Sequence, residues 1–220
     1  MQAAGYTGNN VSLINTTILI VYFCSMINNE LARFHFRRFC TESDMSAYDE
    51  LYRLLYSRLV HLSAAIVGSF HLAEEVVSDV FIMIWQKRQE LAAVDNPVVY
   101  IYISTRNRSL NTVQQQKRHR HTSLELLDTD ALAMSPDPEH GMISAEIIQK
   151  IEAAIRSLPD RCQLIFRLVK QDGLRYKEVA ELLDISPKTV DAQLAIAVKK
   201  IAAAIRLDMP QELAQAFLFR

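Results

Sequence analysis

The clearest pattern of hydrophobic and polar positions lies near the C-terminus, between residues 176 and 206. Apolar side chains recur there at helical intervals on both sides of a short interruption. They are Val179, Ala180, Leu182 and Leu183 before it, and Val190, Leu194, Ala197, Ile201 and Ile205 after it. The interruption contains Ser186, which can cap a helix, and Pro187, which suits the first helical position. The pattern predicts two helices joined by a tight turn, the second beginning at Pro187.

The outer face of that second helix is polar in places. Rotation by about 100° per residue puts four side chains opposite the apolar stripe, namely Lys188, Ala192, Ala195 and Lys199, with Thr189, Asp191, Gln193 and Ile196 on the flanks. A helix-turn-helix inserts the start of its second helix into the major groove of DNA. We therefore predict a DNA-reading face here, while the local pattern leaves open an ordinary helical hairpin.

Two further amphipathic stretches occupy the first half of the chain. One runs from Ser46 to Gly68, and its apolar face comprises Tyr48, Leu51, Tyr52, Leu54, Leu55, Leu59, Leu62 and Ile66. The next runs from His71 to Arg88, and we predict that its periodic apolar residues are buried: Ala73, Val76, Val77, Val80, Phe81, Ile84 and Trp85. Its outer side then carries an acidic ridge of Glu74, Glu75, Ser78 and Asp79. Taken alone, such a ridge is usually a solvated face.

A basic helix is predicted to follow. Pro97 disfavours a helical conformation at Asn96, so a new helix should start at about Val98. The sequence has no acidic residue between Asn96 and Leu124, and it combines basic residues, aromatic residues and amides: Arg106, Arg108, Lys117, Arg118 and Arg120, Tyr100 and Tyr102, and Asn107, Asn111 and Gln114 to Gln116. This combination favours a nucleic-acid surface that neutralises phosphate and stacks bases. A solvated basic helix end remains the alternative for residues 117–121 alone.

The remaining patterns define the domain organisation. Residues 125–141 are acidic and weakly periodic, which indicates a linker, and helical patterns resume near Ile143. We predict an all-α chain of two small helical domains joined by a linker, the C-terminal one a helix-turn-helix domain. The expected bounds are an extension over residues 1–25, a first domain over 26–121, an acidic linker over 122–142, a second domain over 143–207 and a tail over 208–220. The sequence leaves open whether translation starts at Met1 or Met26.

Composition changes this picture little, but it excludes several functional classes. The chain has 220 residues, is half hydrophobic with only five glycines, and carries a net charge of -1. Its three cysteines, Cys24, Cys40 and Cys162, have no CxxC spacing, so neither a disulfide framework nor a metal site is indicated and a reducing cytoplasm is the expected compartment. No nucleophile–base grouping or phosphate loop is evident, so we expect no enzyme, cofactor or small-molecule substrate.

Three stretches in order resemble a known family: AEEVVSDVFIMIW from Ala73, NPVVYIYISTRNRSLN from Asn96, and the segment from Ser157 to Ile201 that contains the helix-turn-helix. Together they are similar to the extracytoplasmic-function (ECF) subfamily of bacterial RNA polymerase sigma factors. The resemblance implies a sigma factor that binds core RNA polymerase and directs promoter recognition, DNA melting and transcription initiation. Its partners would be core RNA polymerase, promoter DNA and, as is common in the family, an anti-sigma factor.

The resemblance also assigns roles to residues. It implies core-polymerase binding by Glu74, Glu75, Ser78 and Asp79, minus-ten DNA binding by Asn96, Tyr100, Arg106, Asn107 and Asn111, and minus-thirty-five DNA binding by Ser186, Lys188, Thr189, Gln193 and Lys199. For the acidic ridge, this reverses the preference for a merely solvated face.

The sequence departs from the family pattern at several positions. Asp184 stands where a turn glycine is usual, and Ser78 replaces a common glutamine. Ala195 and Ile196 stand where the family often has serine and arginine, so upstream-element binding should be weaker or depend on shape and methyl contacts. The alternative function is a stand-alone helix-turn-helix regulator that never joins polymerase. The promoter, the inducing signal and the identity of an anti-sigma factor are left open.

Overall fold

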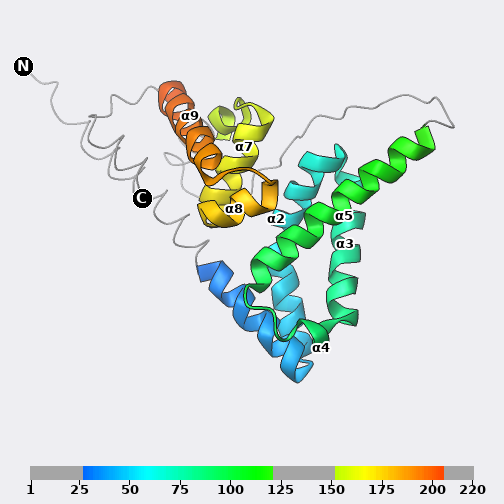
Figure 1. The fold of residues 1–220 in the computed structure, drawn as a ribbon. Coiled ribbons are helices and arrows are strands. Elements are labelled where there is room, and N and C mark those ends of the chain that lie inside the picture. Colours follow the sequence, from blue (N-terminus) through cyan, green and yellow to red (C-terminus); the bar gives the residue numbers. More distant parts are fainter. Residues whose placement is uncertain (1–26, 121–151, 206–220) are drawn as a thin grey trace, which may run out of the picture. The chain divides into compact units, whose positions relative to one another are not determined.

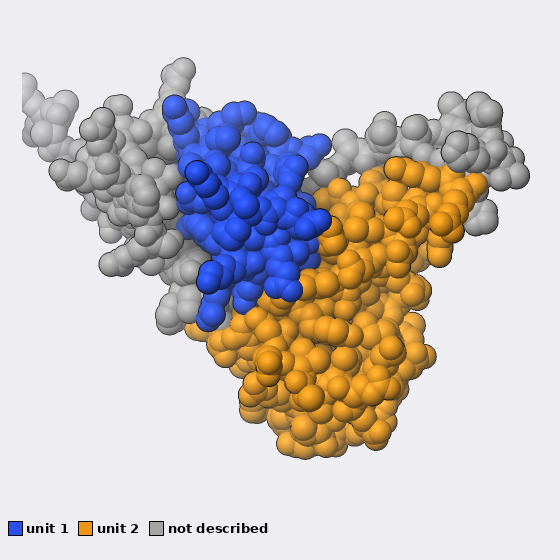
Figure 2. Space-filling view, in the orientation of Figure 1, with its two compact units in different colours: residues 1–26, 135–220 blue, residues 27–134 orange. Residues whose placement is uncertain are grey.

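The structure is a computed structural model that describes residues 27–120 and 152–205. The chain divides into two compact units (Figure 2), and we call their described parts the N-terminal unit and the C-terminal unit. Every regular element in the described ranges is helical, which confirms the predicted all-α fold of two small helical domains. The predicted extension, linker and tail lie outside the described residues. No helix within the described ranges is long and apolar enough to cross a membrane.

The N-terminal unit starts with a helix over residues 27–42, which the apolar pattern had not singled out. The ring of Phe39, almost fully buried, holds this helix against the rest of the unit. Its centroid lies 4.8 Å from that of Tyr48 and 5.6 Å from that of Trp85. Arg58 Nη1 also donates to Asn29 Oδ1 at 2.9 Å. The helix is thus part of the same folded unit as the helices that follow.

Helix α2 spans Met45–Val67, close to its predicted bounds. It begins where Asp44 Oδ1 accepts the N–H groups of Ser46 and Ala47 at 2.9 and 3.3 Å, which satisfies two otherwise unpaired donors. It ends at Gly68, whose φ of 75° is costly for residues with a Cβ atom. Gly68 N–H donates to the Ala64 carbonyl oxygen at 2.9 Å. Local signals therefore fix both ends of α2.

Helices α3 (Phe70–Gln86), α4 (Arg88–Leu91) and α5 (Pro97–Arg120) complete the N-terminal unit (Figure 1). Helix α2 packs against both α3 and α5, and α3 also packs against α5. The predicted inner face of α3 is buried with one exception, and its buried residues are Ala73, Val76, Val77, Val80, Phe81 and Ile84. The exception is Trp85, which is half-buried because it lies at the margin, 5.2 Å from the Tyr48 ring and under the Arg88 guanidinium.

The C-terminal unit contains a helical segment over residues 152–156, then α7 (Asp160–Phe166), the π-helix η1 (Arg167–Gln171), α8 (Tyr176–Leu183) and α9 (Pro187–Ile205). Helix α9 packs against α7 and α8. The π-helix was not anticipated, because the helical patterns expected after Ile143 do not distinguish it from ordinary α-helix. Its wider turn shows in the hydrogen bond from Asp172 N–H to the Arg167 carbonyl oxygen, five residues earlier, at 2.9 Å.

The turn between α8 and α9 has the predicted construction. Asp184 adopts a left-handed conformation with φ 54° and ends α8. Ser186 Oγ then accepts the N–H of Thr189 at 3.0 Å, and α9 begins at Pro187 as expected. The buried stripe of α9 consists of Val190, Leu194, Ala197, Val198 and Ile201. The helix-turn-helix prediction is thereby confirmed.

Candidate functional site

The acidic ridge of α3 faces solvent. Glu74, Glu75 and Asp79 are exposed and Ser78 is half-buried, as the helical pattern predicted. Glu75 Oε1 lies 3.4 Å from His71 Nδ1, one turn earlier on the same helix. An exposed row of carboxylates on a rigid helix can bind a basic surface, because the charges are held in register by the backbone. The ridge is therefore a candidate docking surface.

Two tyrosines of α2 flank the ridge at its N-terminal end. The rings of Tyr52 and Tyr56 stack with centroids 4.7 Å apart, and Tyr56 Oη donates to Glu74 Oε1 at 3.4 Å. Burial raises the pKa of Tyr56 to about 12, with further contributions from Tyr52 and Glu74. Tyr56 is thus a neutral hydrogen-bond donor at physiological pH. The sequence analysis placed Tyr52 on an apolar face and did not single out Tyr56.

An ion pair connects the ridge to the basic helix. Arg108 Nη2 of α5 lies 2.5 Å from Asp79 Oδ2 of α3, and both side chains are about half exposed. Arg108 had been recognised as part of the acid-free segment, but its partner is 29 residues away in sequence. No local pattern could reveal this pair, since it depends on how α3 and α5 pack. Part of the negative charge of the ridge is therefore neutralised within the unit.

The start of α5 carries Asn96 and Tyr100. Asn96 precedes the helix, and its Oδ1 accepts the Val99 N–H at 3.5 Å while its carbonyl oxygen accepts the Tyr100 N–H at 3.0 Å. Asn96 therefore also acts as a helix cap. Tyr100 is half-buried, and its Oη lies 3.9 Å from the Sδ atom of Met83 on α3. The tyrosine ring is thus held against α3 rather than extended into solvent.

The middle of α5 presents the remaining predicted minus-ten residues. Asn107 and Asn111 are exposed, and Arg106 is half-buried with Nη1 3.3 Å from Asn107 Oδ1. Tyr102, however, is fully buried. Its predicted contribution to a nucleic-acid surface is wrong, because it belongs to the buried stripe of α5, which comprises Val98, Ile101, Tyr102, Thr105 and Ser109. Tyr100 is the aromatic residue that remains at this surface.

The predicted minus-thirty-five residues lie just before α9 and along its first four turns. Lys188 and Lys199 are exposed, while Thr189 and Gln193 are half-buried on one flank. Ser186 is exposed, and its Oγ lies 2.8 Å from Thr189 Oγ1 in addition to capping the helix. These two hydroxyls bind each other, so their first role is to fix the start of the helix.

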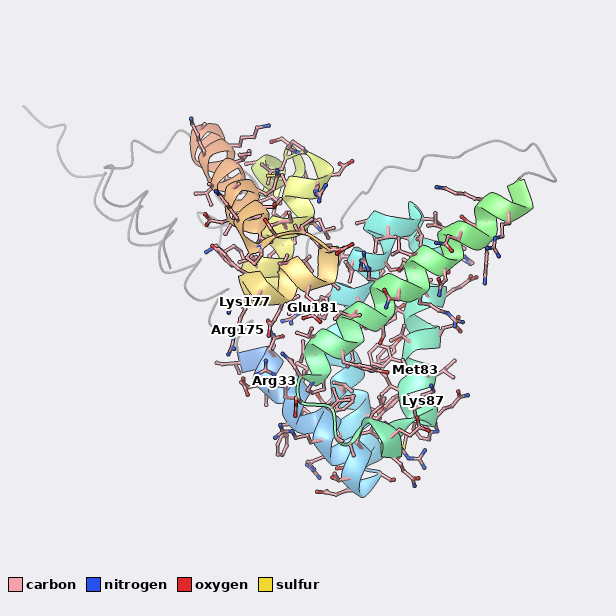
Figure 3. The ribbon with its side chains drawn as sticks, viewed as in Figure 1. Arg33, Met83, Lys87, Arg175, Lys177 and Glu181 are labelled. Atoms are coloured by element: carbon pink, nitrogen blue, oxygen red, sulfur yellow. The ribbon has the colours of Figure 1, made fainter. Side chains whose placement is uncertain are left out.

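Two exposed basic residues that the sequence analysis had not singled out lie at the start of α8. Arg175 occupies the N-cap position and Lys177 the first turn (Figure 3). The Arg175 N–H donates to Glu178 Oε2 at 2.7 Å, which is one half of a capping box. In a helix-turn-helix the first helix crosses the DNA backbone, so basic residues at its start can contact phosphate. The sequence signal that could have identified these two residues is their position at the start of the first helix of the helix-turn-helix.

The described residues contain no group of three or more side chains arranged to hold a metal ion. Cys40 and Cys162 are buried free thiols, and burial raises the pKa of Cys40 to about 11. Burial also lowers the pKa of Lys170, which lies within the π-helix. A buried thiol with a raised pKa is a poor nucleophile. The two thiols are therefore packing residues of the core.

Two sequence profiles match the chain, one on each unit. Residues 47–119 match the profile described as Sigma-70 region 2, and residues 148–201 match that described as Sigma-70, region 4. The chain is similar to the ECF RNA polymerase sigma factor SigW of Bacillus subtilis, with 21% identity over 160 residues, 70% of this chain and 86% of that protein. It is also similar to the ECF RNA polymerase sigma-E factor of Escherichia coli, with 25% identity over 153 residues, 65% of this chain and 80% of the relative.

One solved structure supports the fold. The chain resembles the sigma factor RpoE, in a co-crystal structure with the anti-sigma factor NepR from Bartonella quintana, with a TM-score of 0.53 and 15% sequence identity. The similarity covers 74% of this chain and 98% of that chain.

Proposed function

The chain belongs to the sigma-70 family, in its extracytoplasmic-function subfamily, and we propose which of its surfaces perform the three tasks of such a factor. It directs RNA polymerase to promoters, and members of this family are not catalytic enzymes. The observation that carries the proposal is that both sigma regions are present, region 2 on the N-terminal unit and region 4 on the C-terminal unit. A stand-alone regulator would need only the second.

Core RNA polymerase docks on the acidic ridge of α3. The exposure of three carboxylates on one rigid helix supports this assignment, because such a row is complementary to a basic partner. The stacked pair of Tyr52 and Tyr56 supports it further, since aromatic faces beside carboxylates favour arginine side chains. Ser78 lies within the ridge and would contribute hydrogen bonding rather than charge.

Charge reversal tests the docking surface. Glu75→Lys should weaken binding to core polymerase without unfolding the unit, because substitution of an exposed residue usually changes stability by less than about 0.5 kcal/mol. Glu75 is preferable to Asp79, whose reversal would also place two cations together at Arg108. Binding is measured by fluorescence anisotropy of the labelled full-length chain, with circular dichroism to monitor folding. The matched control is Glu90→Lys, an equal charge change on α4. Equal losses for both variants would mean that only net charge matters.

The first half of α5 binds the minus-ten element in its melted form. Asn96, Tyr100, Arg106, Asn107 and Asn111 lie on that helix or just before it, and its outer side has no acidic residue. Arg106→Ala should reduce the permanganate reactivity of thymines near the start site, since one phosphate contact is lost. Unchanged reactivity, with binding of core polymerase intact, would refute this role.

The outer face of α9 binds the minus-thirty-five element as duplex. The helix-turn-helix geometry and the exposure of Lys188 and Lys199 support this assignment. Lys188→Ala should weaken closed-complex binding more than melting, because this residue would contact duplex phosphate before strand separation. Ser186 and Thr189 support the face by fixing the start of the helix.

Run-off transcription tests the whole proposal. Purified core enzyme with the full-length chain should initiate at the promoter of the chain's own operon, and core enzyme alone should not. Sequence-specific binding of DNA by the isolated chain, with no transcript from the reconstituted enzyme, would favour the stand-alone regulator. We also propose an anti-sigma factor as a regulatory partner, in view of the NepR complex of the similar RpoE, and the cytoplasm as the place of action.

A further inference from the structure

Ile196 is a large apolar side chain on the solvent-facing side of α9, with 44% of its surface exposed. It follows Thr189 by seven residues and Gln193 by three, so at about 100° per residue these three side chains lie along one side of the helix. The exposed Lys188 and Lys199 lie on the adjoining side. An apolar side chain therefore lies exposed on the outer face of α9, beside two cations.

The surroundings of Ile196 restrict what it can recognise. Its exposed neighbours on the outer face, Ala192 and Ala195, have methyl side chains and no hydrogen-bonding groups. The only acidic side chain of α9 within the described residues is Asp191, about 140° away around the helix. A polyanion with an apolar feature in a groove fits this face, since lysines can contact phosphates while the isoleucine contacts a base edge.

We propose that Ile196 reads the C5-methyl group of a thymine in the upstream promoter element. This inference rests on the proposed function of α9 in binding duplex DNA. The thymine methyl group is the only apolar feature that base edges present in the major groove, so it is the feature an aliphatic side chain can distinguish. Ile196 thus supplies selectivity for a methyl group, which no hydrogen bond can recognise.

Helix geometry limits where the thymine lies. Gln193 and Ile196 are three residues apart, which is about 4.5 Å along the helix axis. Successive base pairs are about 3.4 Å apart. The thymine should therefore lie within about two base pairs of the pair that Gln193 contacts, for which adenine is the usual partner of a glutamine.

The test removes a single methyl group from the DNA. Holoenzyme made of core polymerase and the full-length chain first selects duplexes from a randomised library. Each thymine of the selected upstream element is then replaced, one at a time, by deoxyuridine, which differs only in lacking the C5-methyl group. One such replacement should weaken binding about fourfold, the factor expected for one buried methyl group. Ile196→Ala holoenzyme should bind the thymine and deoxyuridine duplexes equally.

Controls separate this role from others. Met45→Ala, which truncates an equally exposed apolar residue at the start of α2, should keep the full difference between thymine and deoxyuridine. Three results would overturn the inference: no thymine whose methyl group matters, a methyl effect that persists in Ile196→Ala, or weaker binding of that variant to core polymerase without DNA. The last result would mean that Ile196 contacts core polymerase rather than DNA. A wild-type holoenzyme that selects no duplex at all would refute the proposed function itself.

Discussion

Two serine hydroxyls meet in the core between α2 and α5, and their hydrogen bonds have a direction. Ser63 and Ser109 are both fully buried, with Oγ atoms 2.8 Å apart. The Ser109 hydroxyl also donates to the Thr105 carbonyl oxygen at 2.8 Å. Since a hydroxyl has one proton to donate, Ser63 must be the donor between the two serines. The hydrogen bonds run from Ser63 through Ser109 to the backbone of α5.

This direction predicts unequal effects of removing each hydroxyl. Ser109→Ala leaves the Ser63 O–H buried without its acceptor, and an unsatisfied buried group costs about 1–3 kcal/mol. Ser63→Ala leaves Ser109 bonded to Thr105, so only one net hydrogen bond worth about 0.5–1.5 kcal/mol is lost. The double variant removes both polar groups and should be close to neutral, giving a coupling energy of about 1 kcal/mol or more. The gain in helix propensity from serine to alanine is the same in both single variants, so it does not affect the difference between them.

Urea unfolding of the full-length chain measures these free energies. Trp85 is the only tryptophan and lies on α3, so its fluorescence follows the N-terminal unit alone. Thr112→Ala is the matched control, because the Thr112 hydroxyl bonds a backbone carbonyl of α5 at a solvent-accessible position, and it should change stability by less than about 0.5 kcal/mol. If Ser63→Ala costs as much as Ser109→Ala, the direction derived from the structure is wrong.

Three further perturbations follow from particular contacts. Ser186→Ala should cost the C-terminal unit about 1 kcal/mol in thermal melts followed by circular dichroism, because the cap on the Thr189 N–H is lost, whereas Ser186→Asp should retain it. A double-mutant cycle of Asp79→Asn and Arg108→Gln should give a coupling of about 0.2–1 kcal/mol that disappears in about 1 M salt, and persistence there would contradict a solvent-exposed pair. In ultraviolet titrations Tyr56→Phe should remove a component that titrates at about pH 12. The pKa of Tyr56 is higher in the folded than in the unfolded protein, so the stabilising contribution of this residue is present below about pH 10 and declines as pH rises towards 12. Loss of a component near pH 10 would contradict that assignment.

Several wrong or incomplete expectations share one cause. Tyr102 was expected at the surface because it is aromatic and lies among basic residues, but it points into the core with Thr105 and Ser109. The buried stripe of α5 contains two hydroxyl residues and a tyrosine, so its hydrophobic periodicity is weak and its inner face could not be identified from sequence. Trp85 was expected to be buried from its spacing, yet it lies at the margin of the core. In both residues the depth of burial depends on the neighbouring helices.

The sequence by itself determined most of the helices and several of their ends, because those depend on local physics; it did not indicate the helix over residues 27–42 or the π-helix. Apolar spacing defined the inner faces of α3 and α9, while Gly68, Pro97 and the pair of Ser186 and Pro187 marked where helices end or begin. It also predicted the exposure of the acidic ridge and of the outer face of α9, since a residue opposite an apolar stripe faces solvent. The roles assigned to those faces stay predictions.

Only the tertiary structure decided which of these side chains are already engaged with one another. The contact between Asp79 and Arg108, the bond between Ser63 and Ser109, and the position of Tyr56 on Glu74 each join residues of different helices. Periodicity gives the face of a helix on which a side chain lies, but the rotation and separation of two packed helices determine which side chains meet. Those relations depend on the whole core, and for that reason no local stretch of sequence specifies them.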